Sequence, residues 1–214
     1  MSPPNEGTPG TNPTSTVAPG DPTASNGASP AAKASPQAKV VYLTFDDGPS
    51  EKWTPQVLTI LAKHKAKATF FQLGSESRRL PDLVRQVRAA GHTIGDHTDV
   101  HRNLTKLSSD RIREEIRRGP ASRCLRPPYG AVNSRVRKVA AELKQQIVLW
   151  DGDTLDWRRP GASKITQRIV KHAQPGAIIL MHDGGGNRSQ TVAALDPALT
   201  KLAKKGYSFK ALDC

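Results

Sequence analysis

Two adjacent carboxylates at the end of an apolar run constrain this chain more than any other feature. The run 40–43 is short, begins with β-branched residues and is soon stopped by Gly48 and Pro49, so it is predicted to be a buried strand. Asp46 and Asp47 then lie where the strand breaks into a turn. Neighbours on a strand point to opposite sides, but at a turn both can face one cleft, one carboxylate binding a cation while the other moves protons. A turn without function is the alternative, because Asp, Gly and Pro are ordinary turn residues.

Residues 1–38 differ in composition from the rest of the chain. They are almost wholly Pro, Thr, Ser, Gly, Ala and Asn, and Val17 is their only large aliphatic residue. Such a segment cannot bury enough apolar surface to offset its ordering entropy. We therefore predict a disordered linker over 1–38 and one domain over 39–214.

No apolar run approaches the length of a membrane span, and the N-terminus lacks the apolar segment of a signal peptide. We expect a secreted or cell-wall-associated protein whose signal peptide has been removed. A cytoplasmic protein is the alternative.

Predicted strands alternate with predicted helices through the rest of the chain. The strand-like runs are 40–43, 68–71, 92–95, 124–126, 147–150, 177–181 and 207–209. Apolar strands alternating with helices predict a parallel α/β sheet with helices outside, and seven strands predict a barrel or near-barrel. Functional side chains of such folds gather after the carboxyl ends of the strands. Titratable residues follow several of these runs, so we expect the site on that rim.

His97 and His101 are four residues apart, which places two imidazoles on one side of a helical turn or tight loop. A pair with this spacing is more often a solvated helix face, because a metal site also needs a third ligand and supporting contacts. Asp47 can be that third ligand. Two histidines and a carboxylate with an open position suit one divalent metal ion, Zn²⁺ in the first place and Co²⁺ or Ni²⁺ as alternatives.

Five stretches resemble, in order, the motifs of the polysaccharide deacetylases, the NodB-homology group also called carbohydrate esterase family 4. They are 44–49, 97–101, 126–129, 153–157 and 178–182, and each lies at the end of a predicted strand or just after it. The resemblance covers the chain from about Val40 to its C-terminus. It implies a distorted (β/α) barrel, a catalytic domain at 39–214, and a metal-dependent hydrolase that removes acetyl groups from N-acetylated or O-acetylated sugars.

The resemblance also implies roles for the residues of the first motifs. Asp47, His97 and His101 would bind the metal. Asp46, beside the metal but not bound to it, would take a proton from water as general base. Arg126 would pair with that base and hold it ionised and oriented.

The later motifs complete the site that the resemblance implies. His182 would protonate the leaving amine, and Asp156 would raise its pKa as an ionic partner. The backbone N–H of Tyr129 would stabilise the oxyanion, while Trp157 and Leu180 would shape the groove wall and the pocket for the acetate methyl. Taken singly, these residues are as readily explained by burial and strand packing.

Three further positions leave alternatives open. The family usually carries an aromatic residue between the two histidines, where this chain has Asp99; an acidic side chain there is expected to alter metal affinity or to bind a substrate group. Cys124 and Cys214 allow one disulfide, and two buried thiols are an equal alternative.

The chain is strongly basic, with a formal net charge of +13. Residues 1–38 hold one lysine and two acidic residues, so the core carries +14. This charge favours polyanionic surroundings. An anionic bacterial cell wall is the preferred partner, and we expect no nucleic-acid binding because the chain has no recognised nucleic-acid module.

These features lead to one functional prediction. We predict a monomeric N-deacetylase that acts on N-acetylglucosamine polymers, either peptidoglycan or chitin oligosaccharides. An acetylxylan esterase of the same family and a catalytically weak cell-wall-binding protein are the alternatives.

Overall fold

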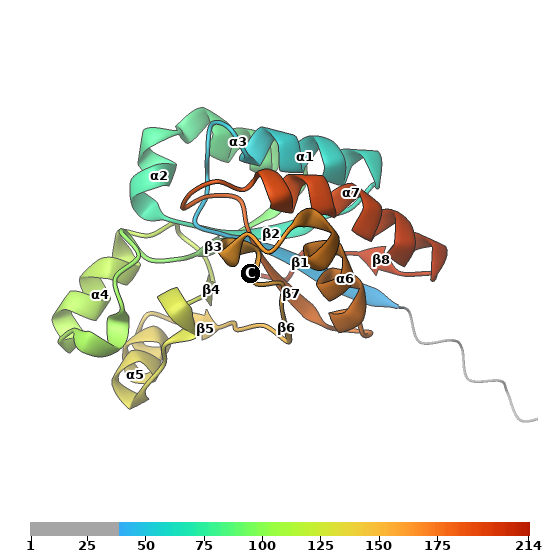
Figure 1. Cartoon of the computed structure of the whole chain (residues 1–214). Helices are drawn as coiled ribbons and strands as arrows, with labels where there is room; N and C mark the ends of the chain where they lie inside the picture. Colours follow the sequence, from blue (N-terminus) through green and yellow to red (C-terminus); the bar gives the residue numbers. More distant parts are fainter. Residues whose placement is uncertain (1–38) are drawn as a thin grey trace, which may run out of the picture. The chain divides into compact units, whose positions relative to one another are not determined.

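The computed structural model describes residues 39–214, so the linker predicted at 1–38 lies outside the described residues. Strands and helices alternate along the chain (Figure 1). The strands are β1 Val40–Asp46, β2 Ala68–Gln72, β3 Thr93–Asp96, β4 Cys124–Leu125, β5 Gln146–Ile147, β6 Gly152–Asp153, β7 Ile178–His182 and β8 Ser208–Phe209. The helices are α1 Thr54–Lys63, α2 Gly74–Arg79, α3 Pro81–Ala89, α4 Ser109–Arg117, α5 Ser134–Glu142, α6 Ala162–His172 and α7 Ser189–Lys204, with short 3₁₀ turns η1 Leu104–Lys106, η2 Pro128–Gly130 and η3 Asp156–Arg158. Within 39–214, none of the helices has the length and apolar character needed to cross a membrane.

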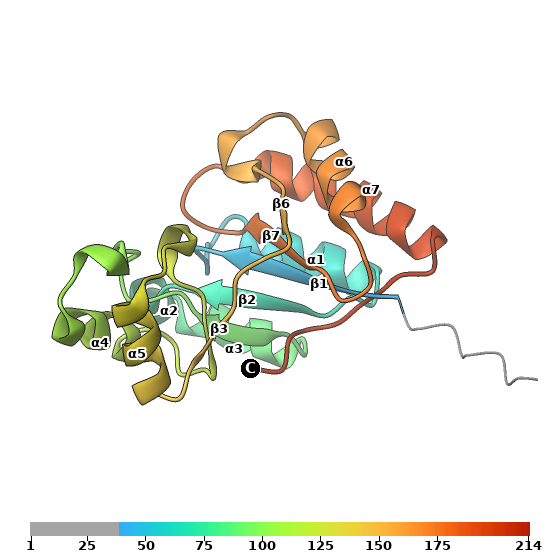
Figure 2. The same ribbon diagram turned by 90° about the horizontal axis from the view of Figure 1, so that it is seen from below.

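The strands form one parallel sheet in the order β5-β4-β3-β2-β1-β7-β6, and β8 pairs with β1 off this path. The sheet is curled (Figure 2), and its two edge strands, β5 and β6, follow one another in sequence. The curled parallel sheet with outer helices confirms the predicted distorted (β/α) barrel.

Side-chain alternation on β1 separates the hydrophobic core from the interior of the barrel. Leu43 and Phe45 are fully buried in the main core. Thr44 and Asp46 point to the opposite side, as alternate residues of a strand must, and there they bind the same arginine. Asp46 is in register with His182 on β7. Two polar side chains are thereby delivered to neighbouring positions at the carboxyl end of the sheet.

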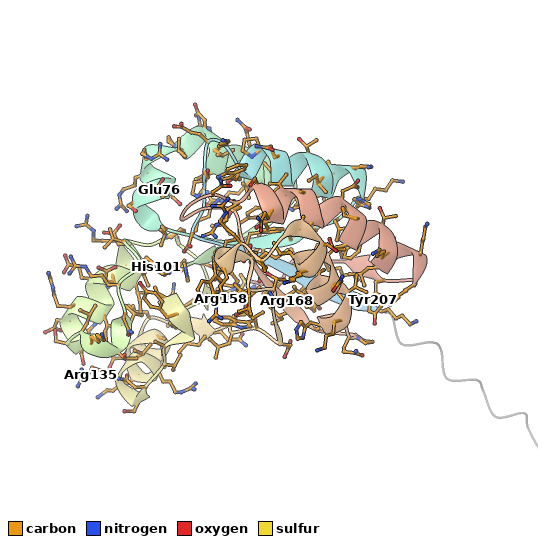
Figure 3. All side chains as sticks on the ribbon, in the orientation of Figure 1. Glu76, His101, Arg135, Arg158, Arg168 and Tyr207 are labelled. Carbon is orange, nitrogen blue, oxygen red and sulfur yellow. A yellow bond between two sulfur atoms is a disulfide. The ribbon has the colours of Figure 1, made fainter. Side chains whose placement is uncertain are left out.

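Helices cover the outer face of the sheet in two groups (Figures 1 and 2). Helix α7 packs against α1 and α6, and α1 also contacts α3. Helices α4 and α5 pack on each other around a second, smaller core. Ser108 and Asn133 begin these two helices by accepting hydrogen bonds from the backbone N–H groups of Arg111 and Val136, which is the usual function of an N-cap side chain. Charged side chains such as Arg135 of α5 lie on the outer faces (Figure 3).

The strand predicted at 147–150 is largely absent: β5 ends at Ile147, β6 begins at Gly152, and residues 148–150 belong to neither strand. Arg126 accounts for the interruption. Its Nε and Nη2 donate to the carbonyl oxygens of Val148 and Leu149 at 3.2 and 3.1 Å, so these carbonyls bind a side chain instead of a neighbouring strand. The guanidinium lies 4.0 Å from the centroid of the Phe71 ring and fills the opening between the two edge strands.

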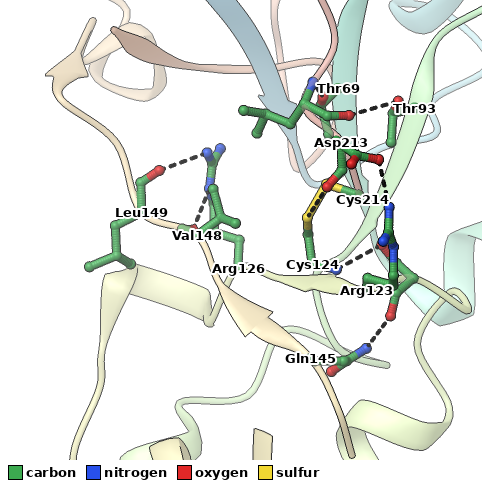
Figure 4. Close-up of a disulfide and its surroundings, with 12 residues drawn as sticks. Thr69, Thr93, Arg123, Cys124, Arg126, Gln145, Val148, Leu149, Asp213 and Cys214 are labelled. Carbon is green, nitrogen blue, oxygen red and sulfur yellow. Dashed lines mark hydrogen bonds and ion pairs between the residues drawn. A yellow bond between two sulfur atoms is a disulfide. The ribbon is translucent and has the colours of Figure 1, made fainter. Parts of the chain in front are cut away.

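A disulfide joins Cys124 of β4 to the C-terminal Cys214, with the two Cα atoms 5.1 Å apart (Figure 4). Of the two alternatives left open by the sequence, the disulfide is therefore the one observed. The segment that ends in Cys214 is also bound to the sheet by its backbone. The N–H of Leu212 donates to the hydroxyl of Thr69 at 2.9 Å, and the hydroxyl of Thr93 donates to the Leu212 carbonyl at 3.1 Å. The C-terminal segment thus links β2, β3 and β4.

Candidate active site

The carboxylate pair lies at the carboxyl end of β1. Asp46 is the last residue of the strand, and Asp47 has a φ of 70°, a left-handed conformation that Asp tolerates better than most residues. This change of backbone direction puts both side chains in the wall of one cleft of about 360 Å³. His97, His101 and His182 line the same cleft.

Asp47, His97 and His101 form a candidate metal-binding triad. Oδ1 of Asp47 lies 3.5 Å from Nε2 of His97 and 3.4 Å from Nε2 of His101, and the three candidate ligand atoms lie within 4.8 Å of one another. His101, labelled in Figure 3, follows β3 on the loop before η1.

The chemistry of these side chains fits a divalent cation. Oδ1 of Asp47 is buried and has no hydrogen-bond partner among the described residues, which is costly for a carboxylate oxygen unless a cation binds it. Nδ1 of His97 lies 2.6 Å from the carbonyl oxygen of Arg126. Because a carbonyl only accepts, Nδ1 must donate, which leaves Nε2 as the nitrogen that can bind a metal in the cleft.

The electrostatics of two of these groups also favours ligation. Burial opposes the charge of Asp47, but the proximity and charge of His97, with contributions from His182 and His101, hold the pKa of the carboxyl well below its usual range. For His101 burial prevails and lowers the pKa of the imidazole. An ionised carboxylate and a neutral imidazole are the forms that bind metal.

Asp46 is held from behind by Arg126. Oδ1 of Asp46 accepts from Nη1 of Arg126 at 2.8 Å, and the same nitrogen donates to the Thr44 hydroxyl at 2.8 Å. Both charges are buried, and a buried pair of this kind is stable only when its hydrogen bonds are made. Oδ2 of Asp46 remains on the cleft side, 3.8 Å from Nε2 of His97.

His182 is oriented by Asp156. Its Nδ1 lies 2.7 Å from Oδ1 of Asp156, whose Oδ2 accepts from the His182 backbone N–H at 2.9 Å and from the Thr191 hydroxyl at 2.8 Å. Burial disfavours the charged imidazole, but the hydrogen bond and charge of Asp156 outweigh it and raise the pKa of His182. With Nδ1 bound to the carboxylate, Nε2 is the nitrogen available to the cleft.

The remaining predicted residues, Tyr129, Trp157 and Leu180, also line this cleft. Leu180 is buried, whereas the side chains of Trp157 and Tyr129 are exposed at 47% and 67%. Tyr129 has a φ of 63°, and its ring lies 4.6 Å from that of His101. All ten residues proposed from the sequence therefore lie at this cleft or directly behind it.

Sequence reasoning missed three residues that line the cleft: Trp150, Asp153 and Arg188. Trp150 is the last residue of the predicted strand 147–150. Because functional residues gather at strand ends, its position could have identified it. Arg188 had no such signal. Its Nε and Nη2 donate to the carbonyls of Gly184 and Gly185 at 2.6 and 3.1 Å, and Nη2 lies 3.8 Å from Oδ2 of Asp47.

Asp99 does not face the cleft. Its carboxylate is directed toward Arg78 and Arg118, and Asp99 is not among the residues that line the cleft. The physical reason is that both arginines offer a buried carboxylate strong charged hydrogen bonds on the side away from the histidines.

The fold and the cleft place this chain among the barrel enzymes whose active sites lie after the carboxyl ends of the strands. The chain belongs to the polysaccharide deacetylase family, whose model matches residues 33–148. This finding confirms the resemblance seen in the five sequence motifs.

Individual relatives agree with this assignment. A peptidoglycan-N-acetylglucosamine deacetylase of Bacillus cereus is 44% identical over 181 residues, which cover 80% of this chain and 85% of the relative. A chitooligosaccharide deacetylase of Rhizobium leguminosarum bv. trifolii is 38% identical, over 80% of this chain and 89% of the relative. Among solved structures, a peptidoglycan N-acetylglucosamine deacetylase in complex with 4-naphthalen-1-yl-N-oxidanyl-benzamide matches with a TM-score of 0.78 and 38% identity, over 82% of this chain and 86% of the other.

Proposed function

We propose that this protein is a metal-dependent N-deacetylase that hydrolyses N-acetyl groups of N-acetylglucosamine-containing polysaccharide, in peptidoglycan or chitin oligosaccharides, and releases acetate. One observation carries the proposal. A candidate metal triad, an arginine-bound carboxylate and an aspartate-bound histidine converge on one cleft. The names of the relatives supply the substrate class.

Asp47, His97 and His101 would hold one divalent metal ion, with Zn²⁺ as the first candidate and Co²⁺ or Ni²⁺ as alternatives. Two imidazole nitrogens and one carboxylate oxygen are ligands that suit metals of this borderline class. A metal at this position would supply the Lewis acidity that activates water and polarises the acetyl carbonyl.

Asp46 is the base in this proposal. Arg126 binds Oδ1, so Oδ2 is the oxygen that can accept a proton from the attacking water. The water oxygen forms a bond to the acetyl carbon, and its proton passes to Asp46. Arg126 keeps the carboxylate in one orientation throughout, because it is itself fixed by the carbonyls of Val148 and Leu149.

His182 is the acid that completes the hydrolysis. As the bond between the acetyl carbon and nitrogen breaks, Nε2 of His182 donates a proton to the nitrogen, and the sugar amine leaves with acetate as the other product. The carboxylate of Asp156 stabilises the imidazolium before transfer. The backbone N–H of Tyr129 would donate to the oxygen on which negative charge develops.

The walls of the cleft suit a carbohydrate chain. Trp157 and Tyr129 expose aromatic faces beside the catalytic groups, and Trp150 also lines the cleft. Leu180, which lines the cleft, would provide an apolar surface for the acetate methyl. We further propose that the enzyme is monomeric, secreted or associated with the cell wall, and attracted to anionic wall polymers through its positive charge.

Acetate release from N-acetylchitooligosaccharides, peptidoglycan and acetylated xylan, measured in parallel, tests the proposal. We expect release from the first two substrates. Release from xylan alone would instead identify an acetylxylan esterase, and no release from any of the three by metal-loaded protein would leave a wall-binding protein.

A further inference from the structure

Asp99 lies between His97 and His101 in the sequence, and its buried carboxylate has no part in the proposed chemistry. Asp99 is 5% exposed, and its Oδ2 accepts from Nε of Arg118 at 2.6 Å. Its other oxygen is bound by Nη2 of Arg78. Arg78 belongs to α2 and Arg118 directly follows α4. Asp99 therefore connects the loop after β3 to two helices that are distant from each other in sequence.

The backbone of the same loop is bound to the same two helices. The carbonyls of Thr98 and Asp99 accept from the N–H groups of Gly74 and Ser75, at the start of α2, at 2.9 and 3.1 Å. On the other side, the N–H of Val100 donates to Oε2 of Glu115 on α4 at 3.2 Å. Gly74 has no room for a side chain, because a Cβ would collide with the carbonyl of Arg118.

The loop needs such support because its backbone is strained. Thr98 has a φ of 69° and His101 a φ of 63°. The left-handed region is unfavourable for a residue with a side chain, and for a β-branched residue such as Thr it is an outlier. Conformations of this kind persist only where surrounding contacts fix them. Here they set the direction of the His101 side chain relative to His97, whose ring centroid lies 5.0 Å away.

We propose that Asp99 is a positioning residue for metal binding: by pairing with Arg78 and Arg118 it holds the loop that sets the separation of the His97 and His101 imidazoles. Asp99 touches neither the cleft nor any candidate ligand atom. The proposal rests on the proposed function only in taking His97 and His101 as metal ligands.

The pairing is suited to this task because its carboxylate is buried and therefore largely shielded from water. The Asp99 side chain is 7% exposed, whereas those of Arg78 and Arg118 are about half exposed. Arg78 also donates to the Arg118 carbonyl at 2.7 Å. Each of the three residues is therefore hydrogen-bonded to the other two. An amide in place of the carboxylate keeps one acceptor oxygen and turns an NH2 group, which only donates, toward the other arginine. The hydrogen bond that remains is also weaker, because it has lost the charge of its acceptor.

The test is the dissociation constant for Zn²⁺ of the chelator-stripped full chain, measured by competition with a chromophoric chelator and without substrate. Asp99→Asn keeps the shape of the side chain and removes its charge. We expect its dissociation constant to rise by about tenfold or more, the effect typical of losing a contact that orients metal ligands. Arg78→Gln and Arg118→Gln each leave one arginine in place and should give smaller increases.

Asp196→Asn is the matched control. Asp196 also pairs with two basic side chains, Lys63 and His64, but on the α1–α7 side of the molecule. The dissociation constant of the Asp196→Asn variant for Zn²⁺ should stay within about twofold of the wild-type value.

Two outcomes would overturn the proposal. One is an unchanged metal affinity in Asp99→Asn or, if that variant does not fold, in both arginine variants. The other is an equal loss in Asp196→Asn. A wild-type protein that binds Zn²⁺ but releases no acetate would remove the proposed function and leave this inference intact, because affinity is measured apart from turnover.

Discussion

At the scale of single residues, two neighbouring aspartates are given different tasks by their surroundings. Asp46 ends a strand, faces the barrel interior and is bound by Arg126. Asp47 adopts a left-handed backbone, and among residues 39–214 one of its oxygens has no hydrogen-bond partner beside two imidazoles. The change in backbone conformation between the two residues thus separates the proposed base from the candidate metal ligand.

This division predicts different losses for two conservative changes. Asp46→Asn should retain metal and lose most turnover, because the amide cannot accept the proton. Asp47→Asn should bind metal more weakly, because a charged ligand becomes neutral. Metal content and acetate release, measured on both variants, check this. Wild-type turnover by Asp46→Asn would show that another group is the base.

The pairing of His182 with Asp156 predicts the dependence of activity on pH. As the proposed acid, His182 must carry a proton, and its raised pKa keeps the imidazole protonated to higher pH. Activity should therefore fall as pH rises through that pKa. Burial lowers the pKa of His182 and Asp156 raises it. In Asp156→Asn the raising effect is lost, so the pKa of His182 should fall. The basic limb of kcat/KM should therefore move to lower pH, and an unmoved limb would assign it to another group.

The same pair should affect stability with a defined sign. The raised pKa of His182 gives a contribution that is complete below the unfolded value of about 6.5 and is lost as pH rises through the folded pKa. The lowered pKa of Asp156 gives a contribution present above the unfolded value of about 3.9 and lost as pH falls through the folded pKa.

At the scale of elements, the barrel is held closed by side chains and by the chain end rather than by strand pairing alone. Arg126 fills the opening between β5 and β6, and the C-terminal segment binds β2 and β3 and ends in the disulfide to β4. The strand carrying Cys124 leads directly to Arg126, so this closure also supports the arginine that holds the base.

The disulfide should contribute measurably to stability. It joins residues 90 positions apart, and although the loop entropy alone would give somewhat more, disulfides typically contribute about 2–4 kcal/mol. Cys214→Ser should lower the free energy of unfolding in urea by about that amount. Reductant should lower the wild-type value equally and leave the variant unchanged. Equal unfolding midpoints for oxidised wild type and variant would show that the bond carries no stability.

At the scale of the whole molecule, sequence patterns predicted the architecture and the members of the site, because both follow from short-range periodicity. Strand ends mark the rim, and Asp46, His97 and His182 are found there. Pairings between distant residues were not predictable in this way. Asp99 meets Arg118 and Arg78 19 and 21 positions away, and no spacing rule connects them. The end of β5 at Ile147 was likewise not predictable, because the carbonyls of Val148 and Leu149 bind Arg126, which follows β4.

The net charge predicts how salt affects different substrates. The chain carries +13 and should be drawn to peptidoglycan with acidic peptides or wall polymers. Between low salt and about 0.5 M the Debye length shrinks to a few ångströms, so the rate on whole peptidoglycan should fall. The rate on a neutral chitin oligomer should barely change. An equal response of both substrates to salt would remove charge as the basis of polymer preference.

The most direct test of the account is acetate release from an N-acetylchitooligosaccharide by chelator-stripped protein, titrated with Zn²⁺. We expect no release from the stripped wild-type protein and full recovery near one equivalent of metal, because Asp47, His97 and His101 form the one candidate triad within residues 39–214. His97→Ala, which lacks one ligand, should not recover at that equivalence. Full turnover by the stripped wild-type protein, or full recovery of His97→Ala at one equivalent, would contradict the central claim.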